Sequence, residues 1–389
     1  MAQSSGSFID LRSCNFVSRY IQGPGALKHL ASLLQSLQAG RVLVIAGKKA
    51  MNVLEDYGLF KLVESTGASY TKLVFGDGPC GAECCDEEIE RLVKLANRES
   101  FDVVIGAGGG KAIDTAKAVA HMLKLPLVVV PTIASTTAPC TSLSAVYTCN
   151  HVFKEYRYWS RNPYAVIVDT KIIMNAPVKY LACGIGDTVC RYTEVSDIAK
   201  ARDVNSILKQ LNNGETLIGL SATGVMIRAV LGYGEEAVKS VERKEHSNAL
   251  ELVVEAVTLL SQIAYECSGI SGLVPHAIYN AFTHLRPLEK YRNSAFPCHG
   301  EVVFYGLLID MTLKNYSEKE IANMMRFGRR IGLATNLSEL GFNNIDYNEI
   351  TLIAEEASKE LQSISPGEIV KAIKEVERLS SKAVKRLKL

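Results

Sequence analysis

Short apolar runs alternate with segments of helical periodicity over the first 175 residues. Five of these runs have the length and composition of buried strands: Arg41–Ala46, Lys72–Phe75, Phe101–Ile105, Leu127–Val130 and Ala165–Val168. Between them, apolar residues return every three or four positions in Asp86–Asn97 and Ala112–Leu123, which is typical of amphipathic helices. Strand, helix and strand in repeated order predict a mostly parallel sheet with helices on both faces.

The pattern changes to helices alone after about residue 175. Apolar residues recur at spacings of three and four in several segments: Ile207–Leu211, Leu217–Met226, Asn248–Cys267, Leu307–Leu313 and Ile350–Leu361. No segment after Asp169 alternates as a strand does. We therefore predict an α/β domain with a parallel sheet over residues 1–175 and an all-helical domain over residues 176–389. Pro177 interrupts the helical pattern close to this boundary.

Composition and charge exclude several classes of protein. With 48% hydrophobic and 22% charged residues, a chain of 389 residues can bury a large core and is not disordered. A formal charge of +2 gives no basic excess for binding nucleic acid. The best candidate for a membrane span, Leu125–Ile133, is far shorter than the roughly 18 residues required, and the first residues lack a secretory signal. We expect a cytoplasmic protein with neither a nucleic-acid nor a membrane partner.

Ten cysteines are too few for a disulfide-rich scaffold in a chain of this length. Their only cluster, Cys80, Cys84 and Cys85, lies in the acidic, turn-rich stretch GDGPCGAECCDEE. A zinc site would need further ligands at short spacing, which the flanking residues do not offer. We expect reduced thiols in structural roles, with a metal or redox role as the alternative.

A glycine-rich turn, GAGGG, joins the predicted strand Phe101–Ile105 to the helix that follows it, and it contains Gly108, Gly109 and Gly110. Glycines at the end of a strand let the backbone approach a pyrophosphate, and the first N–H groups of the next helix attract the same anion. The spacing differs from GxGxxG, so an ordinary tight turn is the alternative. The position between strand and helix favours a phosphate-binding loop.

Hydroxyl side chains gather after the next strand, in the segment PTIASTTAP at residues 131–139. They include Thr132, Ser135 and Thr137. Because open α/β sheets bind ligands at the carboxyl ends of parallel strands, we expect this segment and the glycine-rich turn to lie at one edge of the sheet. Turn and capping roles are the alternative for these hydroxyls.

Three side chains in the helical half have the chemistry of metal ligands. Asp187 lies in GIGDT, His276 in VPHAI and His299 in CHGE. One carboxylate and two imidazoles suit zinc or ferrous iron and leave a coordination position open for a substrate oxygen. The three are far apart in the chain, so spacing alone does not establish a shared site, and a helix-capping role is the simpler alternative for Asp187.

Several long motifs together resemble one family. GAGGGKAIDTAKAVA, PTIASTTAPCTSLSAVY, LACGIGDTVCRYTEV and HAIYNAFT occur in the order found in the glycerol dehydrogenase-like members of the iron-containing (family III) alcohol dehydrogenases. The resemblance implies an N-terminal Rossmann-like, dinucleotide-binding domain and a C-terminal helical domain of the dehydroquinate synthase-like type, with the metal between them. It also implies a homo-oligomer.

The resemblance assigns roles to residues of this chain. Asp187, His276 and His299 match the metal ligands, which act in catalysis through zinc, with iron as the alternative. Residues matching the pyrophosphate side of the cofactor site are Gly108, Gly109, Gly110 and Asp114. Residues matching its nicotinamide end are Thr132, Ser135, Thr141, Leu143 and Tyr147. The implied reaction is hydride transfer between NAD(P) and the carbinol carbon of a small polyol such as glycerol, with the metal acting as a Lewis acid.

The chain also departs from the family. Thr137 occupies the place of the Asp in STDAP that contacts the polyol hydroxyls, so it is a substrate-side candidate. Gly47, Lys48 and Lys49 follow the first strand where an acid normally reads the adenine ribose. An acid selects a free 2′-hydroxyl and a cation accommodates a 2′-phosphate, so Gly47 and Lys48 favour NADP over NAD. The stretch between His276 and His299 is also longer than usual.

Four functions remain open at this point. The leading hypothesis is a metal-dependent NAD(P) polyol dehydrogenase. The alternative is an NADPH-dependent reductase of small 2-oxo acids, of the hydroxycarboxylate dehydrogenase type, because a branch of the family shares both substitutions. A dehydroquinate synthase-like lyase is more remote, since its phosphate-recognising basic residues are not found here. An inactive binding homologue is the fourth, against which the three retained metal ligands argue.

Overall fold

The computed structural model describes residues 15–195, 217–268, 272–292 and 296–387. Its centre is a six-stranded sheet in which every pair of neighbouring strands is parallel. In spatial order the strands are β1 (Arg19–Gly23), β8 (Ala165–Asp169), β5 (Leu127–Pro131), β4 (Val103–Gly108), β2 (Arg41–Gly47) and β3 (Ser69–Phe75). The five strands expected from the sequence are all present, with ends shifted by a few residues.

Side chains alternate between the two faces of the sheet, as the period of a strand requires. In β2, Val42 and Val44 belong to one hydrophobic core and Leu43 and Ile45 to the other, and all four are fully buried. The first face is covered by α1 (Leu30–Ser36), α2 (Lys48–Asp56) and α3 (Leu59–Glu64). The second face is covered by α4 (Asp86–Ala96) and α5 (Gly110–Met122). Burial on both faces explains why these strands are continuous apolar runs.

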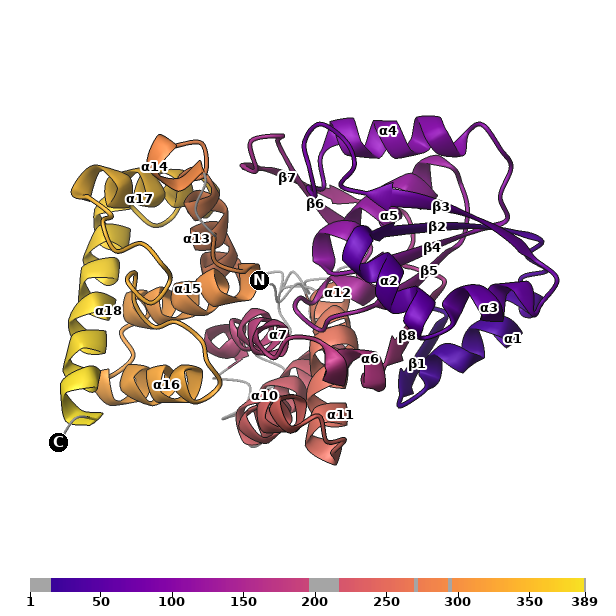
Figure 1. Ribbon diagram of the computed structural model, residues 1–389. Coiled ribbons are helices and arrows are strands. Elements are labelled where there is room, and N and C mark those ends of the chain that lie inside the picture. The colour runs from indigo at the N-terminus through magenta and orange to yellow at the C-terminus, as the bar shows by residue number, and fades with distance from the viewer. Residues whose placement is uncertain (1–14, 196–216, 269–271, 293–295, 388–389) are drawn as a thin grey trace, which may run out of the picture.

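Two features of this half were not expected. The edge strand β1 has a mixed sequence, RYIQG, which gives no strand signal. A separate antiparallel hairpin pairs β6 (Leu143–Tyr147) with β7 (Phe153–Tyr158). The sequence of β7, FKEYRY, is largely polar because the strand is only partly buried. Figure 1 shows the hairpin projecting from the sheet domain towards the C-terminal helices.

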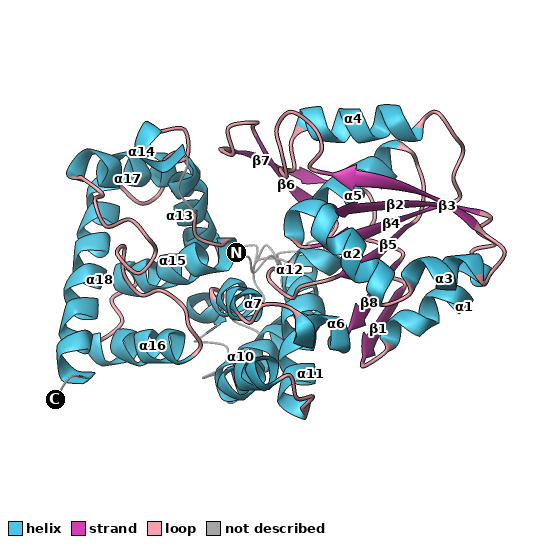
Figure 2. Cartoon of the chain, in the orientation of Figure 1, coloured by secondary structure: helices cyan, strands magenta, loops and turns pink. Residues whose placement is uncertain are grey.

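Every described element beyond Asp169 is a helix, as expected (Figure 2). The elements are α6 (Thr170–Asn175), α7 (Lys179–Val189), α10 (Leu217–Arg243), α11 (Asn248–Glu255), a π-helical turn (Ala256–Leu260), α12 (Ser261–Ser268), α13 (Leu273–Thr283), α14 (Glu289–Arg292), α15 (His299–Leu313), α16 (Glu318–Arg330), α17 (Tyr347–Leu361) and α18 (Pro366–Leu387). The helix expected at Ile207–Leu211 lies outside the described residues. The predicted α/β plus helical architecture is confirmed, whereas the boundary at residue 175 remains a prediction.

The C-terminal helices α13 to α18 gather at the end of the molecule away from the sheet (Figure 1). Helices α10 and α11 instead lie against α6, and α11 also contacts β1. Among the helices that the structure describes, none is both long enough and apolar enough to cross a membrane.

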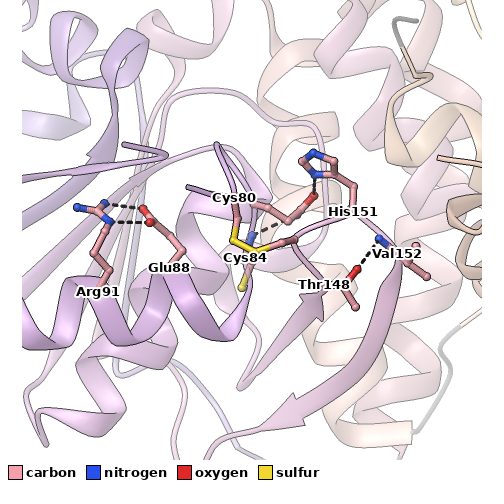
Figure 3. The surroundings of a disulfide bond; sticks show 9 residues. Cys80, Cys84, Glu88, Arg91, Thr148, His151 and Val152 are labelled. Carbon is pink, nitrogen blue, oxygen red and sulfur yellow. Dashed lines mark hydrogen bonds and ion pairs between the residues drawn. A yellow bond between two sulfur atoms is a disulfide. The ribbon is translucent and has the colours of Figure 1, made fainter. Parts of the chain in front are cut away.

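The expectation that the thiols are reduced is wrong for one pair. Cys80 and Cys149 form a disulfide, with their Cα atoms 4.7 Å apart (Figure 3). Cys80 lies in the loop after β3, and Cys149 lies in the turn between β6 and β7. The two are separated by 69 residues, and only the unpredicted hairpin brings them together. The seven other cysteines within the described ranges form no disulfide.

Candidate active site

A cavity of about 870 Å³ lies between the carboxyl edge of the sheet and the C-terminal helices. It brings together nine of the residues selected from the sequence: Gly110, Asp114, Thr137, Thr141, Leu143, Tyr147, Asp187, His276 and His299. Gly47, Lys48, Gly108, Gly109, Thr132 and Ser135 do not line it. The cavity therefore joins the two groups of candidates, those for the cofactor and those for the metal.

The three candidate metal ligands converge at one end of this cavity. Oδ1 of Asp187 lies 3.2 Å from Nε2 of His276 and 3.4 Å from Nε2 of His299. Ligand atoms that are about 2.0–2.2 Å from a tetrahedral zinc ion are roughly 3.3–3.6 Å from one another. Each imidazole nitrogen therefore lies at a distance from the Asp187 oxygen that suits two ligands of one divalent cation.

Asp187 is held in its charged form by its surroundings. The side chain is almost completely buried, and its Oδ2 accepts a hydrogen bond of 2.8 Å from the backbone N–H of Thr137. Burial alone would raise the pKa of Asp187, but the neighbouring His299 and His276 hold that pKa well below its usual value. A carboxylate that is ionised at neutral pH is what a metal ligand requires.

The first turn of α13 orients His276. Its Nδ1 lies 3.0 Å from the carbonyl oxygen of Gly272, so Nδ1 donates there and Nε2 is the nitrogen that faces Asp187 and would face a bound metal. Gly272 has φ 71°, a left-handed conformation that favours glycine. The carboxylate of Glu194 accepts hydrogen bonds from the backbone N–H groups of Gly272 and Leu273, each 3.0 Å long, and so fixes the start of the helix.

Glycines let the two helices that carry the other ligands come close together. A Cβ atom on Gly186, next to Asp187, would lie 2.4 Å from the carbonyl oxygen of Gly300. A Cβ on Gly300, next to His299, would lie 1.8 Å from the carbonyl oxygen of Cys183. The glycines in GIGD and CHGE therefore allow the contact between α7 and α15 that places Asp187 beside His299.

The glycine-rich turn meets the hydroxyl segment at the edge of the sheet, as predicted. Gly108 has φ 134°, and Gly109 is the N-cap of α5. A Cβ on Gly109 would lie 2.8 Å from Cδ1 of Ile133, and one on Gly110 would lie 3.0 Å from Oγ1 of Thr136. Because the residues at the start of α5 are glycines, no side chain shields the first N–H groups of the helix, which suits the binding of a pyrophosphate.

Comparisons with known proteins agree with this geometry. Residues 17–170 match the model of the family described as iron-containing alcohol dehydrogenase. Over 350 residues the chain is 38% identical to the glycerol dehydrogenase of Thermotoga maritima, with 90% of each protein covered. This chain belongs to the iron-containing alcohol dehydrogenase family. The family assignment made from the motifs is therefore confirmed.

Two further relatives of this family member cover almost the whole chain. The glycerol dehydrogenase of Pseudomonas putida is 33% identical over 359 residues, which is 92% of each protein. The crystal structure of glycerol dehydrogenase from Schizosaccharomyces pombe superposes with a TM-score of 0.83 at 27% identity, covering 97% of this chain and 93% of that one.

A buried lysine that was not predicted from the sequence organises the part of the cavity wall where the cofactor site is predicted. Nζ of Lys117 donates to Oδ1 of Asp114 at 3.0 Å, to the carbonyl oxygens of Ala138 and Leu143 at 2.7 and 2.8 Å, and to Oγ1 of Thr141 at 2.9 Å. Lys117 is only 4% exposed. A charged residue on the buried face of α5 was the available signal, and its role is to hold the loop that carries Thr141 and Leu143.

At the adenine end of the predicted cofactor site, Lys48 has an unforeseen partner. Its Nζ lies 2.8 Å from Oδ1 of Asp77, which follows β3, and both side chains are exposed. Lys48 is therefore not a free cation. A Cβ atom on Gly47 would meet only Phe75, at 3.8 Å, so a side chain is tolerated at this position.

A second group of hydrogen-bonded side chains that was not predicted lies in the cavity wall near α13. Nδ2 of Asn280 donates to the hydroxyl of Tyr156 at 3.1 Å and to Oε2 of Glu360 at 3.0 Å. Tyr156 and Glu360 line the cavity, and Asn280 is one turn of α13 after His276. Glu360 thus presents a carboxylate to the cavity that also contains Thr137 and Asp187.

Proposed function

We propose that this family member is a metal-dependent oxidoreductase that transfers a hydride between NAD(P) and the carbinol carbon of a small polyol such as glycerol. The observation that carries the proposal is the convergence of Asp187, His276 and His299 in the same cavity as Gly110 and Leu143. Relatives that share most of their length with this chain are named glycerol dehydrogenases.

We propose zinc as the metal, with iron as the alternative, because one carboxylate and two imidazoles suit either ion. When bound, the metal would supply Lewis acidity towards an alcohol oxygen and the nicotinamide would accept the hydride. The chain's own residues hold the candidate metal ligands and the loop at the nicotinamide end in position. Gly272 fixes the tautomer of His276, Thr137 orients Asp187, and Lys117 holds the loop beside the nicotinamide end.

For the cofactor we propose acceptance of NADP, with NADP favoured over NAD. Gly47 offers no carboxylate to bond the 2′-hydroxyl of the ribose, and Lys48 lies next to it in the chain. Asp77 competes with a 2′-phosphate for Lys48, which makes the preference smaller than a free lysine would give.

The carboxylate of Glu360 in the cavity wall favours the binding of a neutral polyol over that of an anionic substrate. Glu360 accepts one hydrogen bond from Asn280 through Oε2 and presents its charge to the cavity. A second negative charge nearby would be repelled, whereas polyol hydroxyls can donate to a carboxylate. The 2-oxo acid reductase is therefore the less favoured alternative.

The family resemblance is also the ground for proposing a homo-oligomer and a cytoplasmic location.

A panel of glycerol, propanediols, butanediols and 2-oxo acids, each assayed with NAD(H) and NADP(H), tests the function. We expect metal-dependent oxidation of the vicinal diols. The matched control is Asp187→Asn, which keeps the shape of the side chain but removes its charge. Turnover of 2-oxo acids alone would establish the alternative function, and turnover that is unaffected by Asp187→Asn would contradict the metal assignment.

A further inference from the structure

A second group of metal-binding side chains surrounds the disulfide. It consists of Cys80 and Cys85 from the loop after β3, Glu87 from the first turn of α4 and Cys149 from the hairpin turn. One ligand atom from each of the four lies within 4.8 Å of the others. None of the four lines the cavity that contains Asp187, His276 and His299.

We propose that the Cys80–Cys149 disulfide is the oxidised form of a second metal site. In the reduced form, the thiolates of Cys80, Cys85 and Cys149 and the carboxylate of Glu87 bind one thiophilic divalent cation of the zinc class. Cys80, Cys85 and Glu87 are close together in the chain and provide three ligands. The turn between β6 and β7 provides the fourth, Cys149.

The donor set suits zinc. Three sulfur atoms and one carboxylate oxygen form a tetrahedral set of the kind that closes a structural zinc site. Sulfur ligands about 2.3 Å from a tetrahedral zinc ion are roughly 3.8 Å apart. The bonded sulfur atoms of Cys80 and Cys149 must therefore separate after reduction, whereas the other ligand atoms, which lie within 4.8 Å, need only small movements. Cys85 is fully buried and Cys80 is 6% exposed, while Cys149 is half-buried and Glu87 is exposed. The cation therefore has a way in from one side.

The interconversion of the two forms balances without any group from the active site. A dithiol gives two electrons and two protons to the disulfide, becomes a disulfide itself, and leaves Cys80 and Cys149 as thiols. Binding of the cation then displaces one proton from each of the three thiols. Because each thiol must lose its proton to bind the cation, the affinity should rise with pH.

Both forms join the same two segments of the chain. The backbone N–H of Tyr147 donates to the carbonyl oxygen of Cys84 at 2.8 Å. Nδ1 of His151, which Figure 3 labels, lies 2.7 Å from Oε2 of Glu83. These contacts hold the hairpin turn against the loop after β3. Because β6 carries Tyr147 into the cavity, a metal at this site would keep the cavity wall in place after the disulfide is reduced.

Cobalt distinguishes this site from the candidate active site, because thiolate ligands give a charge-transfer absorption in the near ultraviolet and carboxylate and imidazole ligands do not. The full-length protein is reduced with dithiothreitol, freed from it without oxygen, and titrated with Co²⁺. We expect the charge-transfer band to saturate at one equivalent in the reduced protein and to be absent from the oxidised protein. Cys85→Ala and Cys149→Ala should lose the band.

Cys84→Ala is the matched control for Cys85→Ala, since both thiols are fully buried and adjacent in the chain, and it should keep the band. Cys149 lies in a partly exposed turn, so Cys149→Ala should fold and still test the proposal even if Cys85→Ala does not fold. A reduced protein without the band would overturn the proposal and leave the disulfide as a crosslink alone. A band that survives both substitutions would also overturn it, because the thiolate ligands would then belong to another group, such as Cys190 beside Asp187 and His276 or Cys183 beside Cys298.

Discussion

Gly300 is packed so tightly against Cys183 that a Cβ atom added to it would lie 1.8 Å from the Cys183 carbonyl oxygen. No real pair of atoms of this kind approaches so closely, so any side chain at residue 300 must push α15 away from α7. Gly186 makes the reciprocal contact, because its Cβ would lie 2.4 Å from the Gly300 carbonyl oxygen. The separation of these helices sets the distance between Asp187 and His299.

Gly300→Ala should therefore weaken both the fold and the metal site. Overpacking of a core costs about 1–3 kcal/mol, and the contact with a backbone oxygen places this substitution at the upper end. We expect a lower free energy of unfolding in urea and a loss of bound zinc. Gly232→Ala is the control, because Gly232 has no atom within 4 Å of its added Cβ and lies inside α10, where alanine stabilises a helix by up to about 1 kcal/mol. Unchanged zinc affinity in Gly300→Ala would contradict the role of this contact.

His299→Ala should abolish hydride transfer without removing the cofactor. The loss of one metal ligand removes several kcal/mol of transition-state stabilisation, which corresponds to a fall of about 10²–10⁴-fold in kcat. The metal content should fall with it, while NAD(P)H binding, measured by fluorescence, stays close to that of the wild type. His284→Ala is a matched control, since His284 lies at the end of α13 and contacts Glu356 outside the cavity. Full activity of His299→Ala in the absence of metal would refute the ligand assignment.

The parts of this structure that could be predicted are those determined by neighbouring residues. The strand before Gly108 and the helix after it are local patterns, and the position of the glycines between them indicates a ligand-binding edge. The hairpin was missed because β7 is half-exposed and keeps polar residues, and with it the pairing of Cys80 with Cys149 was missed.

The candidate metal ligands lie on three different elements, α7, α13 and α15, so no spacing in the chain could have joined them. Only the similarity of whole motifs to a family did so. Lys117 is a different case, since its four acceptors belong to segments whose placement depends on the complete fold. The pairing of Lys48 with Asp77 could not be predicted because it depends on β3 ending beside the end of β2.

Glu360→Gln should alter the choice of substrate more than the chemical step. Removing the charge while keeping the shape weakens the acceptor for polyol hydroxyls, so we expect KM for glycerol to rise by about 3- to 30-fold, the effect of losing roughly 0.7–2 kcal/mol of charge-assisted hydrogen bonding. We expect kcat to change little, and the binding of small 2-oxo acids to improve. Glu356→Gln on the same helix is the control because Glu356 does not line the cavity. An unaltered KM for glycerol would exclude Glu360 from substrate binding.

The ionised carboxylate of Glu83 should stabilise the folded protein, and this stabilisation should be lost in acid. The side chain is fully buried, and its Oε2 lies 2.5 Å from Nζ of Lys111 and 2.7 Å from Nδ1 of His151. Burial alone would raise the pKa of Glu83, but these partners lower it below the ordinary value of 4.5. A lowered pKa in the folded state means that the ionised carboxylate stabilises the protein above pH 4.5, and that this contribution is lost as the pH falls through the folded-state pKa.

The comparison that tests this is wild type against Glu83→Gln over a range of pH. Hydrogen bonds to a charged group are worth about 1.5–3 kcal/mol, and the lower end applies because Lys111 and His151 are partly exposed and solvated. We expect the difference in unfolding free energy to be constant near neutral pH and to shrink in acid. A difference that does not depend on pH would show that Glu83 acts by shape alone.

Gly47→Asp should convert the cofactor preference from NADP towards NAD. The backbone at Gly47 is extended, with φ −70°, and a Cβ there would meet only Phe75 at 3.8 Å, so the substitution should not disturb the fold. A carboxylate about 4 Å from a 2′-phosphate costs roughly 1–4 kcal/mol, which is about a fivefold to several-hundredfold loss of NADPH affinity. Asp77→Asn should act in the opposite direction by freeing Lys48, but by no more than about fivefold, since exposed ion pairs contribute up to about 1 kcal/mol. Lys49→Gln is the control for general charge effects. Affinities for both cofactors, measured by fluorescence titration, check the set, and a strong NADH preference in the wild type that Gly47→Asp leaves unchanged would contradict the role assigned to this turn.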